Sequence, residues 1–130
     1  EPMLEGFLVQ KMAEKGVEML VGVAVDPHVG PAVALGFGGI YAEAMGPPVV
    51  EIAPLDETLA LDMIARLDRK NVLDGYRTGI KCDRGALARL LAAISHLAHE
   101  QRDRLAELDI NPVIVSAGSA TAVDALIRLR

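Results

Sequence analysis

The chain has 130 residues, of which 52% are hydrophobic and 24% are charged, a composition typical of one compact globular domain. Its 13 basic and 18 acidic residues give a net charge of −5, which argues against a general affinity for nucleic acids or anionic membranes. The single cysteine, Cys82, excludes an internal disulfide and a multi-cysteine zinc site, so we expect a cytoplasmic protein.

Apolar runs rich in β-branched residues open the sequence and predict strands. Residues 7–12 and 17–26 are expected to form two strands joined tightly by residues 14–16. In the second run, alternate residues are uniformly apolar and predict one buried face: Val17, Met19, Val21, Val23 and Val25. Turn-forming residues at 26–31 precede a third strand over residues 32–35, and a fourth strand is expected over residues 49–53.

Two amphipathic helices are predicted next. Asp56 is a suitable N-cap for a helix over residues 57–67, and Asp83 is a suitable N-cap for a second helix. The second helix carries an apolar stripe at the i, i+3, i+4, i+7 spacing: Leu87, Leu90, Leu91, Ile94, Leu97 and Ala98. The polar residues 68–81 between the helices are expected to form a loop.

A second hairpin is predicted at the end of the chain, with strands over residues 106–115 and 121–127 joined by residues 116–119. The order of strands, two helices and strands, with short hairpin connections, favours an α+β fold. We therefore expect a mostly antiparallel sheet with two helices packed on one face, and not a doubly wound parallel sheet.

The last hairpin carries the best candidate site. On a strand, Glu107, Asp109 and Asn111 share one face, while the residues between them are apolar. If the register places Asp124 opposite them, carboxylate and amide oxygens converge, and hard oxygen donors of this kind suit Mg²⁺ bound together with substrate phosphates. The alternative interpretation is a polar strand face that merely contacts water, with a turn at residues 111–112.

Short motifs occur along nearly all of the 130 residues in a fixed order: Val9-Gln10-Lys11-Met12, Gly16-Val17-Glu18, Gly36-Phe37-Gly38-Gly39-Ile40, Ala53-Pro54-Leu55, Gly75-Tyr76-Arg77 and Glu107-Leu108-Asp109-Ile110-Asn111-Pro112. In this order they resemble the ATP-grasp domain of ADP-forming acyl-CoA synthetases, which are related to succinyl-CoA synthetase. The resemblance implies that residues 1–130 are the C-terminal subdomain of an ATP-grasp domain and belong to a longer synthetase.

The resemblance also implies an activity. Such enzymes reversibly convert a carboxylic acid, CoA and ATP to acyl-CoA, ADP and phosphate, through an acyl phosphate and a phosphohistidine. By this resemblance Asp109, Asn111 and Asp124 hold Mg²⁺ against the phosphates of ATP or ADP, and a hinge segment lies beside the adenine. The nucleotide-binding residues that it implies are Val9, Gln10, Lys11, Met12 and Glu18.

Partners follow from the same resemblance. The CoA-binding and phosphohistidine domains of the synthetase would act with this region, and the isolated chain is not expected to be active. An alternative function is a non-catalytic regulatory or interaction module of a protein acetyltransferase or related fusion, because a fold does not by itself establish an activity. An exposed face that normally meets the first subdomain predicts self-association as a homo-oligomer.

Several other features leave alternatives open. The glycine cluster at residues 36–39 lacks the spacing of a P-loop, so it is either a turn near the nucleotide or a plain turn after a strand. Arg77 either contacts a phosphate or pairs with Asp74 or Asp68. The segment from His96 to Glu100 has the wrong order for a zinc-protease helix, and we expect His96 on a solvated face.

Overall fold

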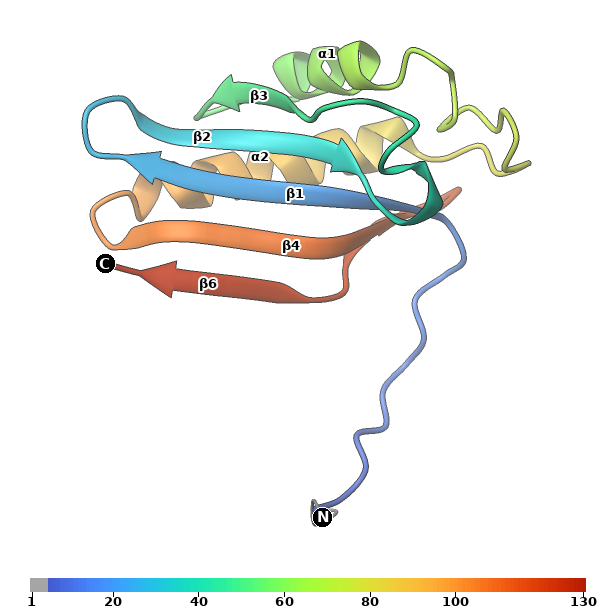
Figure 1. The fold of residues 1–130 in the computed structure, drawn as a ribbon, viewed down its shortest axis with the longest axis horizontal. Coiled ribbons are helices and arrows are strands. Elements are labelled where there is room, and N and C mark those ends of the chain that lie inside the picture. The colour runs from blue at the N-terminus through green and yellow to red at the C-terminus, as the bar shows by residue number, and fades with distance from the viewer. Residues whose placement is uncertain (1–4) are drawn as a thin grey trace.

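The computed structural model describes residues 5–130, which form a six-stranded sheet with two α-helices on one of its faces (Figure 1). The elements are β1 (Val17–Asp26), β2 (Gly30–Phe37), the 3-10 helix η1 (Gly39–Tyr41), β3 (Val49–Ile52), α1 (Glu57–Leu67), α2 (Arg84–Glu100), β4 (Leu105–Val115), β5 (Ala120–Ala122) and β6 (Ala125–Leu129). The strand order is β3-β2-β1-β4-β5, with β6 also paired to β4, and the pairings are antiparallel. The predicted α+β class is confirmed.

The central strand β1 divides its side chains between the two faces of the sheet as predicted. Val17, Met19, Val21 and Val23 are at most 4% exposed on the face covered by the helices. Because side chains alternate along a strand, the intervening residues lie on the opposite face, which the helices leave open. This second face, called the open face below, is where the candidate site lies.

Both helices begin at the predicted residues because their N-caps form. The Asp56 carboxylate accepts a hydrogen bond from the Leu59 amide at 2.8 Å, and Asp83 accepts one from Ala86 at 2.9 Å. Leu97 was expected in the buried stripe of α2, but it is 48% exposed because the buried face runs through Ile94, Ser95 and Ala98 instead. No helix within residues 5–130 is both long and apolar enough to cross a membrane.

The strand predicted over residues 7–12 is wrong. Residues 5–15 form no strand, and the side chains of Phe7, Val9 and Met12 are 86–90% exposed. Figure 1 shows this segment running away from the sheet from the start of β1. The physical reason is that a strand needs a free neighbour for its backbone hydrogen bonds, and both sides of β1 are already occupied by β2 and β4.

The strand predicted over residues 121–127 is divided into β5 and β6. The interruption lies opposite an irregularity in β4, where the register against β1 shifts between Met19 and Val21. The Val123 amide still donates to the carbonyl of Pro112 at 3.0 Å, so the chain follows β4 across the interruption. The predicted hairpin therefore forms, with one break in its second strand.

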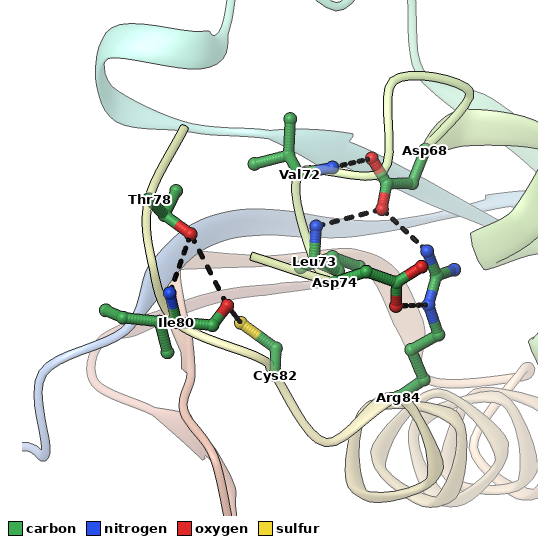
Figure 2. Close-up of polar contacts among 8 residues, drawn as sticks. All are labelled: Asp68, Val72, Leu73, Asp74, Thr78, Ile80, Cys82 and Arg84. Carbon is green, nitrogen blue, oxygen red and sulfur yellow. Dashed lines mark hydrogen bonds and ion pairs between the residues drawn. The ribbon is translucent and has the colours of Figure 1, made fainter. Parts of the chain in front are cut away.

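The predicted loop between the helices is confirmed, and a buried carboxylate organises it (Figure 2). Asp68, whose side chain is 0% exposed, accepts hydrogen bonds from the amides of Val72 (2.8 Å) and Leu73 (2.9 Å) and from Arg84 Nη2 (2.7 Å). Arg84 Nε also binds Asp74 at 3.1 Å.

The predicted pairing of Arg77 with Asp68 or Asp74 is therefore wrong. The first residue of α2, Arg84, reaches both carboxylates instead. The Arg77 guanidinium lies 5.6 Å from the centre of the Tyr76 ring, at an exposed position of the loop. Its proposed contact with a phosphate stays a prediction.

Candidate functional site

The open face of the sheet carries a shallow depression of about 370 Å³ over β1 and β2. Small residues form its floor, because Gly22 lies opposite Ala34 in the β1–β2 ladder and Gly36 lies two residues further along β2. Leu20 and Pro48 form apolar walls. Since the floor side chains are so small, a flat ligand can approach the backbone of the sheet closely. Sequence reasoning missed this floor, although the alternating small residues of the two strands were visible.

Two of the predicted metal ligands line the rim of this depression. Asp109 and Asn111 lie on β4 and are exposed, whereas Leu108 and Ile110, which alternate with them along the strand, are at most 6% exposed. The predicted alternation of this strand is thus confirmed. Asp109 lies opposite Gly22, and its Oδ1 is 3.3 Å from the point that a β-carbon at Gly22 would occupy. Gly22 therefore leaves the space into which the Asp109 carboxylate leans.

Asp124 lies next to Asn111 through the register of β4 with β6. Ile110 lies opposite Ala125, and the Asn111 amide donates to the Asp124 carbonyl at 3.1 Å, so Asn111 and Asp124 are cross-strand neighbours. The register thus places the backbone of Asp124 beside that of Asn111. The Asp124 carboxylate uses Oδ1 to accept the Ala125 amide at 2.9 Å.

The chemistry of this donor set fits a magnesium ion that is shared with a phosphate ligand. Two carboxylates and one amide oxygen are hard donors, and all three residues are exposed, which leaves room for water and phosphate oxygens. Within residues 5–130, no three His, Cys, Asp or Glu side chains come together as a metal site. The role of Asp109, Asn111 and Asp124 as metal ligands stays a prediction.

Glu18 lies on the open face near the start of β1. Its carbonyl accepts the Gly38 amide at 2.9 Å, and its Oε2 is 2.5 Å from the point that a β-carbon at Gly39 would occupy. Gly39 also has a φ of +57°, which glycine adopts without strain. The glycine cluster therefore forms a close turn against β1, and this geometry favours the plain-turn interpretation. Gly36, the first residue of the cluster, contributes to the floor of the depression.

The predicted adenine-binding residues are not brought to the depression. Val9, Gln10, Lys11 and Met12 lie in the exposed segment of residues 5–15. Near the base of this segment, the buried Ser116 hydroxyl donates to the Glu14 carboxylate at 3.2 Å. The adenine-binding role of these four residues stays a prediction.

Other ionisable groups lie away from the depression. His96 is exposed as expected, and His28 lies in the turn after β1, where its amide and that of Val29 donate to Asp26 and lower the pKa of that carboxyl. Burial raises the pKa of the Cys82 thiol, which lies 3.3 Å from the carbonyl oxygen of Val115. A thiol in this state is a poor nucleophile.

Comparison with known sequences identifies relatives along the whole chain. A sequence model of the ATP-grasp domain matches residues 1–129. The chain is 36% identical over 121 residues to acetate–CoA ligase (ADP-forming) I of Archaeoglobus fulgidus, covering 93% of this chain and 18% of that protein. It is also 36% identical over 122 residues to the beta subunit of acetate–CoA ligase (ADP-forming) I of Pyrococcus furiosus, covering 94% of this chain and 52% of the subunit. The chain thus spans about half of that subunit and a smaller part of the single-chain ligase.

Solved structures of acetyl-CoA synthetases also match this chain. An acetyl-CoA synthetase from Ca. Korarchaeum cryptofilum, in complex with coenzyme A, Ca-AMPCP and HgCl+, matches with a TM-score of 0.85 at 36% identity, over 98% of this chain and 56% of that chain. A second structure of that enzyme contains coenzyme A and Mg-AMPPCP, with its phosphohistidine segment pointing towards the nucleotide binding site. It matches with a TM-score of 0.80 at 35% identity, over 91% of this chain and 55% of that chain.

Proposed function

Because the chain belongs to the family of ATP-grasp domains, we propose that it is the magnesium- and nucleotide-binding part of an ADP-forming acyl-CoA synthetase. The reaction of the whole enzyme would convert a carboxylic acid, CoA and ATP reversibly to acyl-CoA, ADP and phosphate. The observation that supports this proposal best is that Asp109 and Asn111 line an apolar depression on the open face, with the backbone of Asp124 beside Asn111.

The depression suits the organic part of the nucleotide. Its base or ribose would lie over the floor formed by Gly22, Ala34 and Gly36, against the apolar side chains of Leu20 and Pro48. Burial of this apolar surface favours binding without any charged contact. The phosphates would then extend toward β4, where the polar residues lie.

The polar residues would hold the metal and fix the phosphates. Asp109, Asn111 and Asp124 each offer an oxygen atom, and Mg²⁺ bound there would neutralise negative charge as a phosphoryl group moves. Asp109 is directed by its position over Gly22, and Asp124 by the hydrogen bond to the Ala125 amide. Residues fixed in this way lose little conformational freedom when the nucleotide binds.

Further parts of the enzyme would complete the site. We place residues 1–130 in the C-terminal half of the ATP-grasp domain, with the segment that holds Val9–Met12 beside the adenine and Glu18 nearby. The remaining half of that domain, and the CoA-binding and phosphohistidine domains, would be supplied by the longer protein, which we expect to act in the cytoplasm. The single-chain relative, of which this chain covers 18%, contains additional chain for these parts.

The test is the affinity for Mg·ADP, measured by titration calorimetry on the full-length parent protein. Replacing Asp124 with alanine is expected to weaken binding at least about tenfold, a loss of about 1.4 kcal/mol, because one of two carboxylate ligands is removed. The matched control is Glu107→Ala, which removes a carboxylate of β4 that is paired with Arg128 at 2.7 Å. Equal affinities of the wild type and the Asp124→Ala variant, with both proteins folded, would refute the proposed site.

A further inference from the structure

The segment of residues 5–15 joins the sheet at a tightly packed point. Val17, the first residue of β1, pairs with Val115 of β4 and is 3% exposed. A β-carbon at Gly16 would overlap the Val115 carbonyl, so glycine lets the backbone of this residue lie directly against β4. The chain is therefore held by β4 up to Gly16, and the direction of the preceding residues depends on what holds residues 14 and 15.

A buried serine holds Glu14. Ser116 directly follows the end of β4 and is 1% exposed, and its hydroxyl donates to the Glu14 carboxylate at 3.2 Å. Among the described residues 5–130, this is the one side-chain hydrogen bond between residues 5–15 and the rest of the chain. The two residues are 102 positions apart in the sequence, so the contact exists only in the folded chain.

A second serine completes this contact. Ser119 Oγ lies 2.8 Å from Ser116 Oγ. An ionised carboxylate only accepts hydrogen bonds, so Ser116 uses its one hydroxyl proton toward Glu14, and Ser119 then donates to Ser116. The Ser119 carbonyl, 3.3 Å from Ser116 Oγ, competes for the same proton, but a charged acceptor forms the stronger bond. The side chains of Glu14, Ser116 and Ser119 form one chain of hydrogen bonds, called the Glu14 anchor below.

The hydroxyl of Ser116 is not required for the turn in which it lies. The Ser116 amide donates to the Ser119 carbonyl at 2.8 Å, which closes the turn between β4 and β5. The Ser116 carbonyl accepts the Asp83 amide, also at 2.8 Å. Because these backbone bonds hold Ser116 in place without its side chain, what the hydroxyl adds is the contact with Glu14.

We propose that Ser116 is a positioning residue for nucleotide binding, because the Glu14 anchor fixes the place from which residues 9–12 extend. This inference rests on the proposed function, in which residues 9–12 lie beside the adenine. Met12 is two residues before Glu14, so a fixed Glu14 keeps the Met12 Cα within about 7 Å of its own. Residues that are held before the nucleotide arrives need less ordering when it binds.

The first test measures the Glu14 anchor without any ligand, by hydrogen exchange of the backbone amides of residues 14–17 in the full-length parent protein. Ser116→Ala is expected to speed this exchange at least about threefold, because the segment is then held by one hydrogen bond fewer. Glu14→Ala is expected to have the same effect, and the double variant no larger one, since both changes remove the same bond.

Ser95→Ala is the matched control for this test. Ser95 is 0% exposed and its hydroxyl oxygen accepts the Leu55 amide at 2.8 Å, so this variant also loses a buried hydroxyl. Ser95 lies about 16 Å along α2 from Arg84, away from the Glu14 anchor. Thermal unfolding measures the stability that each variant loses. No faster exchange in Ser116→Ala, or equally faster exchange in Ser95→Ala, overturns the proposal.

The second test separates the base from the phosphates, by titration calorimetry of the same full-length protein with Mg·ADP and with Mg·pyrophosphate, which has two phosphates and no base. Ser116→Ala is expected to weaken Mg·ADP binding about three- to tenfold, the range for one hydrogen bond, and to leave Mg·pyrophosphate binding unchanged. Asp124→Ala is expected to weaken the binding of both ligands, because it acts on the metal. Unchanged Mg·ADP binding in Ser116→Ala, or equal losses for the two ligands, overturns the positioning role.

A failure of the proposed function gives a different result. If the wild type binds no Mg·ADP, the proposed function and the positioning role both fail, whereas the Glu14 anchor is still judged by hydrogen exchange. If Asp124→Ala leaves both affinities unchanged while Ser116→Ala weakens the binding of Mg·ADP alone, the metal site is refuted and the positioning role is supported.

Discussion

Replacement of Asp68 with alanine is expected to cause a large loss of stability. The Asp68 side chain is 0% exposed and accepts two backbone amides, those of Val72 and Leu73, and one hydrogen bond from Arg84. Each hydrogen bond to a charged group contributes about 1.5–3 kcal/mol. In this variant Arg84 keeps its bond to Asp74. Because the Arg84 side chain is 24% exposed, water replaces part of the interaction that Arg84 loses with Asp68.

The free energy of unfolding of the Asp68→Ala variant should therefore fall by about 3–5 kcal/mol, which is the range for breaking a buried ion pair. Urea unfolding followed by circular dichroism measures this difference directly. The matched control is Asp74→Ala, which removes the other carboxylate bound by Arg84. Because Asp74 is 49% exposed, this change should cost no more than about 1 kcal/mol. If the two variants lost equal stability, the reasoning from burial and backbone contacts would be refuted.

Two further predictions concern close packing and burial near the end of β4. Gly16→Ala should lower the free energy of unfolding by at least about 2 kcal/mol in the same urea assay, because a β-carbon there would overlap the Val115 carbonyl. Gly118→Ala, with no atom near its β-carbon position, is the control, and equal losses would contradict the steric argument. Burial raises the pKa of the Cys82 thiol in the folded protein. The thiol therefore ionises at a lower pH in the unfolded chain than in the folded one. As a result, the free energy of unfolding falls as the pH rises from the ordinary thiol pKa through the raised value. Unfolding measured from about pH 7 to 10 should show this fall in the wild type and not in Cys82→Ala, and parallel curves would contradict it.

Local signals in the sequence identify the helices well. The caps Asp56 and Asp83 and the apolar periodicity that follows them give α1 and the start of α2 at the residues where the structure has them. The alternating apolar residues of β1 likewise identify its buried face. These features are predictable because capping and side-chain periodicity depend on residues within one or two turns of each other.

The candidate site is predictable only in part. The alternation of β4 places Asp109 and Asn111 on one face from the sequence alone, but the position of Asp124 requires the register of β4 with β6. The floor of the depression depends on the register of β1 with β2, which sets Gly22 opposite Ala34. No local pattern contains this information, because the paired residues are far apart along the chain.

The sequence by itself determined the helices, the buried face of β1 and the polar face of β4, since each depends on neighbouring residues. Only the tertiary structure decided that residues 7–12 form no strand, because β2 and β4 occupy both sides of β1. It also decided that Asp68 and Asp74 pair with Arg84 and not with Arg77, because α2 starts beside Asp68. Hydrogen-bonding partners and ion pairs between distant segments are chosen by packing, and packing exists only in the folded chain.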